Sequence, residues 1–522
     1  MSLSQRLAPS EKLSDAEVEN GLRWMLRDGV CSHSMETLAL GPILVAYALY
    51  FEASNLAIGL LAALPNLAQL TLLPAVQVVE KVRRRRLLAV LFAAVSRPML
   101  LVMAAAVLLP SKELGLAVLL GALTLRYAFG AFVGCAWNSW VRDLVPEGRM
   151  GQVFAQRLIW MTAMGMAVSL GASLFVDEWK VWMPGQEAHG YAILLVLAFV
   201  CGAAGTYCVM RMPEPAMPPA ERHLPLIERL AQPLKDGNFR NLVIFLGTWN
   251  FAINLAAPFF TVYLYKRLGL SVTMVTVLLI VSQAANIAVL KTWGRIADKM
   301  SNKGVLTVAA PLFVLSIFLW TFTTLPEKHA MTTPLLVVIH ILTGISTAGV
   351  TLASGNIGLK LAPRGAAASY LSVASLVTAV CAGVAPIFGG LFADWFADRE
   401  LTLILRWTEP ETRHLFQAIN LRHWDFFFGL AAILGLLSLN RLRQVREVGE
   451  VEEDIVLEEL MATARQGMRN LTSVAGLRVA ATYPMEMLFR HTRRRRRRDK
   501  QDGAPTDPPT PPATSSPDGL TP

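Results

Sequence analysis

The sequence predicts an all-α integral membrane protein of twelve transmembrane helices, arranged as two pseudo-symmetric six-helix bundles. Composition is the first indication, because 54% of the 522 residues are hydrophobic and only 16% are charged, whereas a soluble domain carries roughly 25% charged residues. The second indication is that the apolar residues gather in long runs separated by short polar gaps. The third is an internal repeat that relates the two halves.

Each apolar run is close to the roughly 20 residues that a helix needs to cross the hydrocarbon core of a membrane. Helices are expected because lipid offers no water to satisfy backbone groups, and the runs are too long for strands of a barrel. The expected helices lie at 31–51, 56–79, 87–109, 114–137, 154–176, 189–210, 241–264, 272–293, 303–325, 333–355, 366–392 and 424–440.

These runs divide the chain into five regions. They are a cytoplasmic N-terminal segment (1–30), an N-terminal half (31–210), a cytoplasmic linker rich in Pro and charge (211–240), a C-terminal half (241–440) and a cytoplasmic tail (441–522). The opening segment is polar and mixed in charge, so we do not expect a cleavable signal peptide. Residues 396–423 form an unusually long gap, where we expect an amphipathic helix on the outer surface.

The tail carries a basic run, Arg493 to Arg498, followed by a Pro-rich end. The end lacks the apolar content needed to fold, and we expect it to be disordered. The basic run has two interpretations. It binds anionic lipid head groups, at about 1 kcal/mol per residue near the surface, or it is a stop-transfer signal on a solvated tail. Its expected place at a membrane argues against a nucleic-acid partner.

The orientation of the chain follows from its basic residues. Lys and Arg concentrate in the gaps after the second, fourth, sixth, eighth and tenth runs, as in Lys81 and Arg83 to Arg86. Because positively charged loops are retained in the cytoplasm, we expect a multi-pass protein of the cell inner membrane with both termini cytoplasmic.

The repeat has a constant offset. Residues 217 positions apart match in type: Pro146 with Pro363, Phe175 with Phe392, and the amides Asn66 and Gln69 with Gln283 and Asn286. Glu80 and Lys81 precede Asp298 and Lys299 by 218 positions. Agreement of separate places on one register indicates two homologous halves.

Several motifs resemble those of the major facilitator superfamily. Gly294-x-x-x-Asp298-Lys299-x-x-x-Lys303 resembles its signature loop, and it follows the second run of a six-run half, as in that family. Leu123-x-x-Arg126-x-x-x-Gly130 is similar to the fourth-helix motif of its drug:proton antiporters. The segment 385–390, APIFGG, is similar to the glycine–proline motif of helix 5, displaced here to helix 11. The resemblance covers about 31–440.

The chain departs from the family pattern at three positions. Val76 stands where the first-half signature loop has glycine, and Glu80 replaces its aspartate. Phe129 occupies the place of the antiporter glutamine. The resemblance therefore implies the fold and alternating access of the superfamily, and leaves the antiporter subclass open.

The signature loops imply a conformational latch. Its residues would be Glu80, Lys81, Gly294, Asp298, Lys299 and Lys303. Gly294 would allow a neighbouring helix to approach, and Asp298 could meet the dipole at a helix N-terminus. The alternative is that the basic residues of this loop only determine topology.

Charges inside the apolar runs are the strongest candidates for a functional site. Arg126 and Arg97 lie near the middle of the fourth and third runs, and Glu36 lies in the first. A charge in the bilayer interior costs at least about 2.5–3.5 kcal/mol, so each needs a partner or a wet cavity. In the superfamily, helices 1 and 4 border the central cavity. We therefore expect Glu36 to carry a proton and Arg126 to hold an anionic group or tune a carboxylate. Glu36 could instead be an interface residue near the cytoplasm, and Arg97 is expected to make a structural pair.

Uncharged polar residues complete the expected site. The full set for a substrate or coupling-ion cavity is Glu36, Asn66, Gln69, Arg126, Asn250, Asn254, Gln283, Asn286 and His340. The amides could line the cavity or tie helices together, at about 0.6 kcal/mol per hydrogen bond. His340 could titrate near neutral pH or be a packed, hydrogen-bonded residue.

The leading hypothesis is a secondary transporter that moves a small solute by alternating access, with coupling to protons. The alternative is a membrane scaffold or assembly factor on the same fold, although the buried charges argue against it. An enzyme is not expected, because the chain contains no HExxH or GxSxG motif. We expect no cofactor and no metal, since the five cysteines show no ligand spacing. The expected partners are a small-molecule substrate and membrane lipids, with the chain as a monomer.

Overall fold

The computed structural model describes residues 9–11, 13–217, 226–299, 301–324, 328–363, 367–408, 413–422 and 424–447, and the statements below concern these residues. They belong to one compact unit, Met1–Glu453. The remainder of the expected tail, including Arg493 to Arg498, lies outside the described residues.

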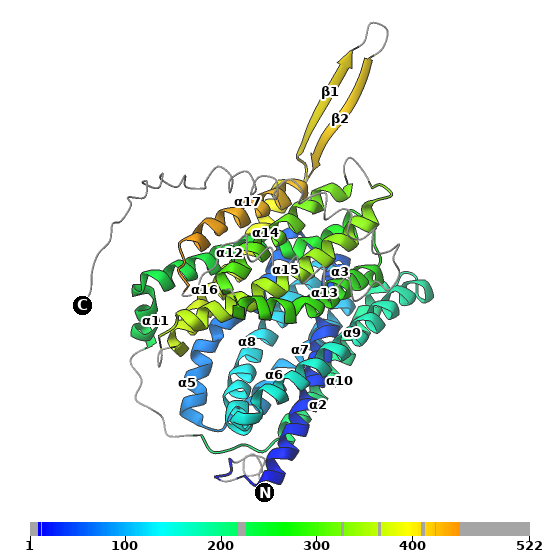
Figure 1. Cartoon of the computed structure of the whole chain (residues 1–522). Helices are drawn as coiled ribbons and strands as arrows, with labels where there is room; N and C mark the ends of the chain where they lie inside the picture. The colour runs from blue at the N-terminus through cyan, green and yellow to red at the C-terminus, as the bar shows by residue number, and fades with distance from the viewer. Residues whose placement is uncertain are drawn as a thin grey trace, which may run out of the picture. The chain divides into compact units, whose positions relative to one another are not determined.

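The N-terminal half is helical (Figure 1). Its α-helices are α2 (Asp15–Ala39), α3 (Gly41–Tyr50), α4 (Asn55–Leu67), α5 (Leu72–Val82), α6 (Arg85–Ser96), α7 (Met99–Ala105), α8 (Lys112–Leu144), α9 (Met150–Trp182) and α10 (Glu187–Arg211). Short 3₁₀ segments η1 (Ala68–Thr71) and η2 (Ala106–Leu108) join or extend them, and η3 (Glu147–Arg149) precedes α9.

The C-terminal half repeats this arrangement. Its helices are α12 (Gly237–Lys266), α13 (Val272–Lys299), α14 (Asn302–Leu319) with η4 (Trp320–Thr324), α15 (Thr332–Leu361), α16 (Ala367–Trp395) and α17 (Trp424–Arg443). Helix α11 (Leu226–Lys235) lies within the segment that the sequence indicates as a linker.

Eleven helical segments in the described part of the chain are long and apolar enough to cross a membrane. The expected first span, 31–51, is divided at Leu40 into α2 and α3, and neither part is among the eleven. Gly41 has a positive φ of 63°, and Pro42 cannot donate a backbone hydrogen bond, so the helix breaks there. Helix α2 also begins earlier than expected, because Ser14 and Glu17 form a capping box at its start.

The prediction of an amphipathic helix at 396–423 is wrong. The segment contains an antiparallel hairpin of β1 (Glu400–Thr408) and β2 (Arg413–Arg422), paired from Glu400 with Arg422 to Thr408 with Arg413 (Figure 1). The sequence ELTLILRWT alternates with a period of two and is rich in residues that favour strands. The fold is therefore helical with one added hairpin, and the prediction of an all-α protein needs that correction.

The two halves meet chiefly along two pairs of helices, with smaller contacts of α3 with α12 and α13. Helix α4 packs against α16, and α9 packs against α13. The first contact depends on glycine, because a Cβ at Gly59 would lie 2.2 Å from the carbonyl oxygen of Pro386. At Gly390 it would lie 2.5 Å from the carbonyl oxygen of Asn55. Backbones that approach this closely are typical of small-residue contacts between membrane helices.

One end of the bundle holds the connections α3 to α4, α9 to α10, α12 to α13 and α16 to β1, and we name it the hairpin end. Two aspartates join the halves there. Asp177, at the end of α9, accepts hydrogen bonds from the backbone N–H groups of Val272 (3.2 Å) and Thr273 (2.7 Å) at the start of α13. Asp394, at the end of α16, accepts from the N–H groups of Asn55 (3.2 Å) and Leu56 (3.1 Å) at the start of α4. A carboxylate at a helix N-terminus accepts hydrogen bonds from the first backbone N–H groups and interacts favourably with the helix dipole.

We call the contacts of Asp177 and Asp394 the cross-half caps, and their positions follow the internal repeat. Asp177 and Asp394 are 217 positions apart. The serines that precede the capped helices, Ser54 and Ser271, are also 217 apart, and each accepts a hydrogen bond from the N–H group three residues on. The structure thus repeats one capping device twice, in the same register that the sequence indicates.

At the opposite end of the bundle α2 begins, α5 meets α6 and α10 leads into the linker, and we name it the linker end. Two glutamates cap helices there. Glu214 accepts from the N–H groups of Arg85 (2.6 Å) and Arg86 (3.1 Å) at the start of α6. Glu447 accepts from Lys303 N–H (2.7 Å) and Asn302 Nδ2 (2.8 Å) at the start of α14. The capped pairs are again 217 apart, but here each carboxylate caps a helix of its own half.

Candidate functional site

An ion pair joins α2 to α8 inside the N-terminal half. Arg126 Nη2 donates to Glu36 Oε1. The Arg126 side chain is 3% exposed, whereas that of Glu36 is 39% exposed. Two residues that we expected separately in the cavity are therefore in contact, with the Arg126 side chain buried and the Glu36 carboxylate partly exposed.

A second charged group lies nearby on α2, α6 and α9. Asp28 is buried and accepts a hydrogen bond from Ser32 Oγ at 2.9 Å. Arg157 Nη2 lies 3.7 Å from Asp28 Oδ2, and the Asp28 charge also acts on Arg97. Glycines make room for these side chains: a Cβ at Gly29 would come within 2.7 Å of Arg157 Nε, and one at Gly202 within 3.2 Å of Arg97 Nε.

Sequence reasoning missed Asp28 and Arg157. Asp28 fell in the segment assigned to the cytoplasm, because the capping box that starts α2 at Asp15 was not recognised. The spacing of Asp28, Ser32 and Glu36 at i, i+4 and i+8 is the available signal, since it places all three on one face of a helix. Arg157 lies within the expected span 154–176 and carries the same signal as Arg126.

Aromatic rings accompany two of the guanidinium groups. The Arg157 guanidinium lies 4.5 Å from the ring centroid of Trp137, and that of Arg126 lies 5.0 Å from the ring centroid of Tyr127. Both rings belong to α8. Cation–π contacts of this kind gain strength where water is excluded. Helix α8 therefore supplies Arg126, the ion-pair partner of Glu36, and both aromatic rings of the site.

The predicted amides lie on several helices and make short-range contacts. Asn250 Nδ2 donates to the Leu246 carbonyl and Asn254 Nδ2 to the Asn250 carbonyl, each at 2.8 Å within α12. Asn66 Nδ2 is 3.5 Å from the Ala382 carbonyl and so links the two halves weakly. Gln69 and Gln283 are exposed and Asn286 is half-buried. Their role in a cavity stays a prediction.

His340 is buried at 5% exposure on α15. Its Nδ1 is 2.7 Å from the Leu336 carbonyl, one turn earlier, and its ring lies 5.7 Å from that of Trp320. These contacts support the packed interpretation of His340.

The expected latch residues lie at the linker end. Glu80, Lys81, Asp298 and Lys299 are exposed, and a Cβ at Gly294 would meet no atom within 4 Å. Lys303 instead belongs to the glutamate cap of α14, where its Nζ also approaches the Arg443 carbonyl at 3.4 Å. The latch stays a prediction.

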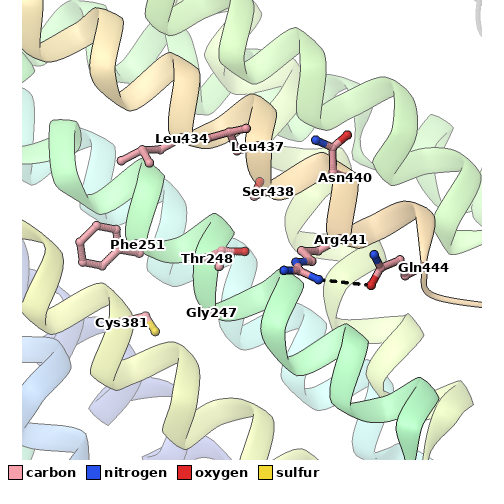
Figure 2. A pocket seen from close by; sticks show the side chains of 10 residues that line it. All are labelled: Gly247, Thr248, Phe251, Cys381, Leu434, Leu437, Ser438, Asn440, Arg441 and Gln444. Carbon is pink, nitrogen blue, oxygen red and sulfur yellow. Dashed lines mark hydrogen bonds between the residues drawn. The ribbon is translucent and has the colours of Figure 1, made fainter.

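A pocket of about 690 Å³ lies between α12, α16 and α17 (Figure 2). Apolar side chains such as Phe251, Leu434 and Leu437 line one part, and Arg441 lies beside Gln444 at the other. The expected cavity residues do not line it. In the described part of the chain, no group of three or more His, Cys, Asp or Glu residues could hold a metal ion.

Comparisons with known proteins agree with this architecture. A family model described as Major Facilitator Superfamily matches residues 29–386. A mutant of the nucleoside transporter NupG has a TM-score of 0.60 at 13% identity, covering 82% of this chain and 100% of that chain. A POT family transporter in complex with 5-aminolevulinic acid has a TM-score of 0.55 at 12% identity, covering 85% and 99%. The comparison with curated proteins found no match. The chain is therefore a membrane protein that belongs to the major facilitator superfamily.

Proposed function

We propose that this protein is a secondary transporter that moves a small solute by alternating access, with coupling to protons. In this proposal α2 and α3 together form the first of twelve transmembrane segments. The linker end is cytoplasmic, since the basic gaps lie there, and the protein acts as a monomer in the inner membrane. The superfamily membership and the transporters of similar fold support a transport function.

The observation that carries the proposal is the Glu36–Arg126 pair. Glu36 lies inside the bundle with its side chain 39% exposed, so in this proposal it is the member of the pair that water reaches. Its partner is sealed at 3% exposure, so the pair cannot simply separate into solvent. Protonation of Glu36 would remove the ion pair and leave Arg126 a buried cation without its anion. Protonation would therefore change the free-energy difference between the inward-open and outward-open conformations, and proton coupling requires such a change.

The cross-half caps support the alternating part of the proposal. Asp177 and Asp394 bond the halves together at the hairpin end, whereas the glutamate caps at the linker end stay within each half. A conformation whose halves are bonded together at one end is one of the two that alternating access needs. In our assignment this conformation is the one that opens to the cytoplasm.

The test is proton flux in proteoliposomes. Purified protein is reconstituted with a trapped pH-sensitive dye, a panel of metabolites is added outside, and proton movement is followed with and without an imposed pH gradient. The wild type should move protons with at least one solute. Glu36→Gln and Arg126→Ala should lose this flux while remaining folded, and Glu52→Gln is the matched control because Glu52 is exposed and pairs with the exposed Lys112.

Two other outcomes would change the assignment. Flux at the wild-type level in both variants would remove Glu36 and Arg126 from the site. Absence of flux with every solute, in well-folded wild type, would favour a scaffold or assembly factor on the same fold.

A further inference from the structure

The pocket between α12, α16 and α17 changes from apolar to polar along α17 (Figure 2). Leu434 and Leu437 line one part of it, and Arg441 and Gln444 line the other. Their spacing along the chain places these four residues on one face of the helix. The volume of about 690 Å³ lies within the range of about 300–1,000 Å³ that is usual for ligand sites. The pocket therefore fits a ligand that is apolar at one end and polar at the other.

The polar part of the pocket holds a positive charge. Arg441 Nη1 lies 3.5 Å from Gln444 Oε1, which belongs to a neutral group. None of the carboxylates in the described part of the chain forms an ion pair with Arg441. The Arg441 side chain is exposed, so an anion from outside the chain can reach it. A guanidinium binds a phosphate group through two parallel hydrogen bonds.

The apolar part of the pocket borders a surface that suits lipid chains. Leu437 lines the pocket and is 55% exposed, and its neighbours Ile433 and Leu436 are also exposed. Because α17 is long and apolar enough to cross a membrane, we expect acyl chains to cover these side chains. An acyl chain can therefore enter the pocket from this surface.

The length of the pocket corresponds to one leaflet of a membrane. From Leu434 to Arg443, the last residue of α17, a helix rises about 14 Å. This rise is close to half of the hydrocarbon thickness of about 30 Å. Arg441 lies in the last turn of α17, at the linker end, which we place in the cytoplasm. The geometry therefore suits a lipid of the cytoplasmic leaflet.

We propose that this pocket binds a phospholipid with an anionic head group. The phosphate group pairs with Arg441, and one acyl chain lies along Phe251, Leu434 and Leu437. The inference goes beyond the proposed transport function and does not depend on it, because Glu36 and Arg126 do not line the pocket. Glu36→Gln should therefore bind the lipid as wild type does, although it should lose proton flux.

The first measurement is the melting temperature of the full-length chain in an uncharged detergent as a ligand is added. Dioleoyl phosphatidylglycerol is compared with dioleoyl phosphatidylcholine, which has the same chains and no net charge, and with glycerol 3-phosphate, which has no chains. The affinity follows from the dependence of the melting temperature on ligand concentration. For phosphatidylglycerol it should be about tenfold higher than for phosphatidylcholine, as expected for one charge-assisted contact. Glycerol 3-phosphate should leave the melting temperature unchanged.

Two variants and a control locate this preference. Arg441→Gln should lose the preference for phosphatidylglycerol, and Arg441→Lys should keep part of it. The matched control is Arg443→Gln, which removes the same charge from an exposed residue of α17 that does not line the pocket. Equal affinities of wild type for the two lipids would overturn the proposal. Equal losses in Arg441→Gln and Arg443→Gln would also overturn it, because they would show attraction to a basic surface.

The second measurement uses Cys381, which lines the pocket from α16. In a variant whose other four cysteines are replaced by alanine, the rate of labelling by N-ethylmaleimide is measured with each lipid. Phosphatidylglycerol should slow the labelling of Cys381 several-fold relative to phosphatidylcholine, and Arg441→Gln should remove this protection. Equal rates in the two lipids would place the bound lipid elsewhere and overturn the proposal. Protection that grows with protein concentration in the absence of lipid would assign the pocket to a second copy of the chain.

These outcomes are separate from those of the transport assay. Selective lipid binding without proton flux would support this inference and remove the transport function. Proton flux without a preference for phosphatidylglycerol would do the reverse.

Discussion

The hairpin end and the linker end use the same chemistry in different ways. At both ends a carboxylate satisfies the first N–H groups of a helix, and at both ends the capped residues recur 217 positions apart. At the hairpin end Asp177 and Asp394 cap helices of the opposite half. At the linker end Glu214 and Glu447 cap helices of their own half. The molecule thus has two pairs of caps, of which one pair bonds the two halves together and the other caps helices within each half.

The largest expected effect comes from removing both cross-half caps. Loss of one N-cap costs about 1 kcal/mol, so Asp177→Asn with Asp394→Asn should weaken the tie by about 2 kcal/mol. Ala57, which is buried in α4, then becomes more accessible. We expect labelling of Ala57→Cys by a membrane-impermeant maleimide, in a background without native cysteines, to rise more than tenfold.

The matched control is Asp398→Asn, an exposed aspartate at the same end. Equal labelling in the control and the double variant would show that the caps do not hold this end closed.

The next effect concerns the close contact of α4 with α16. Gly59→Ala puts a Cβ 2.2 Å from the Pro386 carbonyl oxygen, and overpacking of this kind costs roughly 1–3 kcal/mol. We expect a lower melting temperature and higher labelling of the hairpin end. Gly121→Ala is the control, because a Cβ there meets no atom within 4 Å. Similar melting temperatures for the two variants would contradict the packing described for this contact.

The glutamates at the linker end should respond to pH in opposite directions. Burial raises the pKa of Glu214 above its usual range, although Arg85 and Arg86 donate to it. Burial acts in the same direction on Glu447, but hydrogen bonds from Lys303, Asn302 and Lys360 outweigh it and hold the pKa of Glu447 below its usual range.

The directions of these two pKa shifts determine how the free energy of unfolding changes with pH. Glu447 stabilises the fold above its usual pKa, and this contribution is lost as pH falls through its lowered pKa. Glu214 takes up a proton in the folded state first, so its contribution becomes more favourable as pH falls from neutral toward its usual pKa. Melting curves should show that Glu447→Gln lowers stability at neutral pH, by about 1 kcal/mol, and reduces the loss in acid. Glu214→Gln should cost less at neutral pH; a larger cost than that of Glu447→Gln would contradict these assignments.

The smallest expected effect belongs to Asn66. Its 3.5 Å contact with the Ala382 carbonyl joins the end of α4 to the middle of α16, and such interhelical bonds average about 0.6 kcal/mol. Asn66→Ala should shift the melting temperature only slightly and leave labelling of the hairpin end close to wild type. A loss of proton flux in this variant would instead assign Asn66 to the cavity.

The sequence predicts the helices well because their length and apolarity are local properties. It indicates that Glu36 and Arg126 each need a partner, because a charge in the membrane interior is costly, but it does not pair them with each other. The cross-half caps were not predictable in this way, since Asp177 and the start of α13 are 95 positions apart and only the fold brings them together. Asp28 was missed because the start of α2 depends on the cap at Ser14, and the hairpin was missed because its period-two pattern was not weighed against a helix.

Two spin-label distances test the central claim most directly, one at each end of the bundle. Labels at Glu113 and Ala330 report on the hairpin end, and labels at Arg142 and Leu359 report on the linker end; all four positions are exposed. We predict that a change from alkaline to acidic pH lengthens one distance while it shortens the other, and that Glu36→Gln abolishes this response. Distances that stay fixed with pH, or that change equally in Glu36→Gln, would contradict alternating access driven by protonation of Glu36.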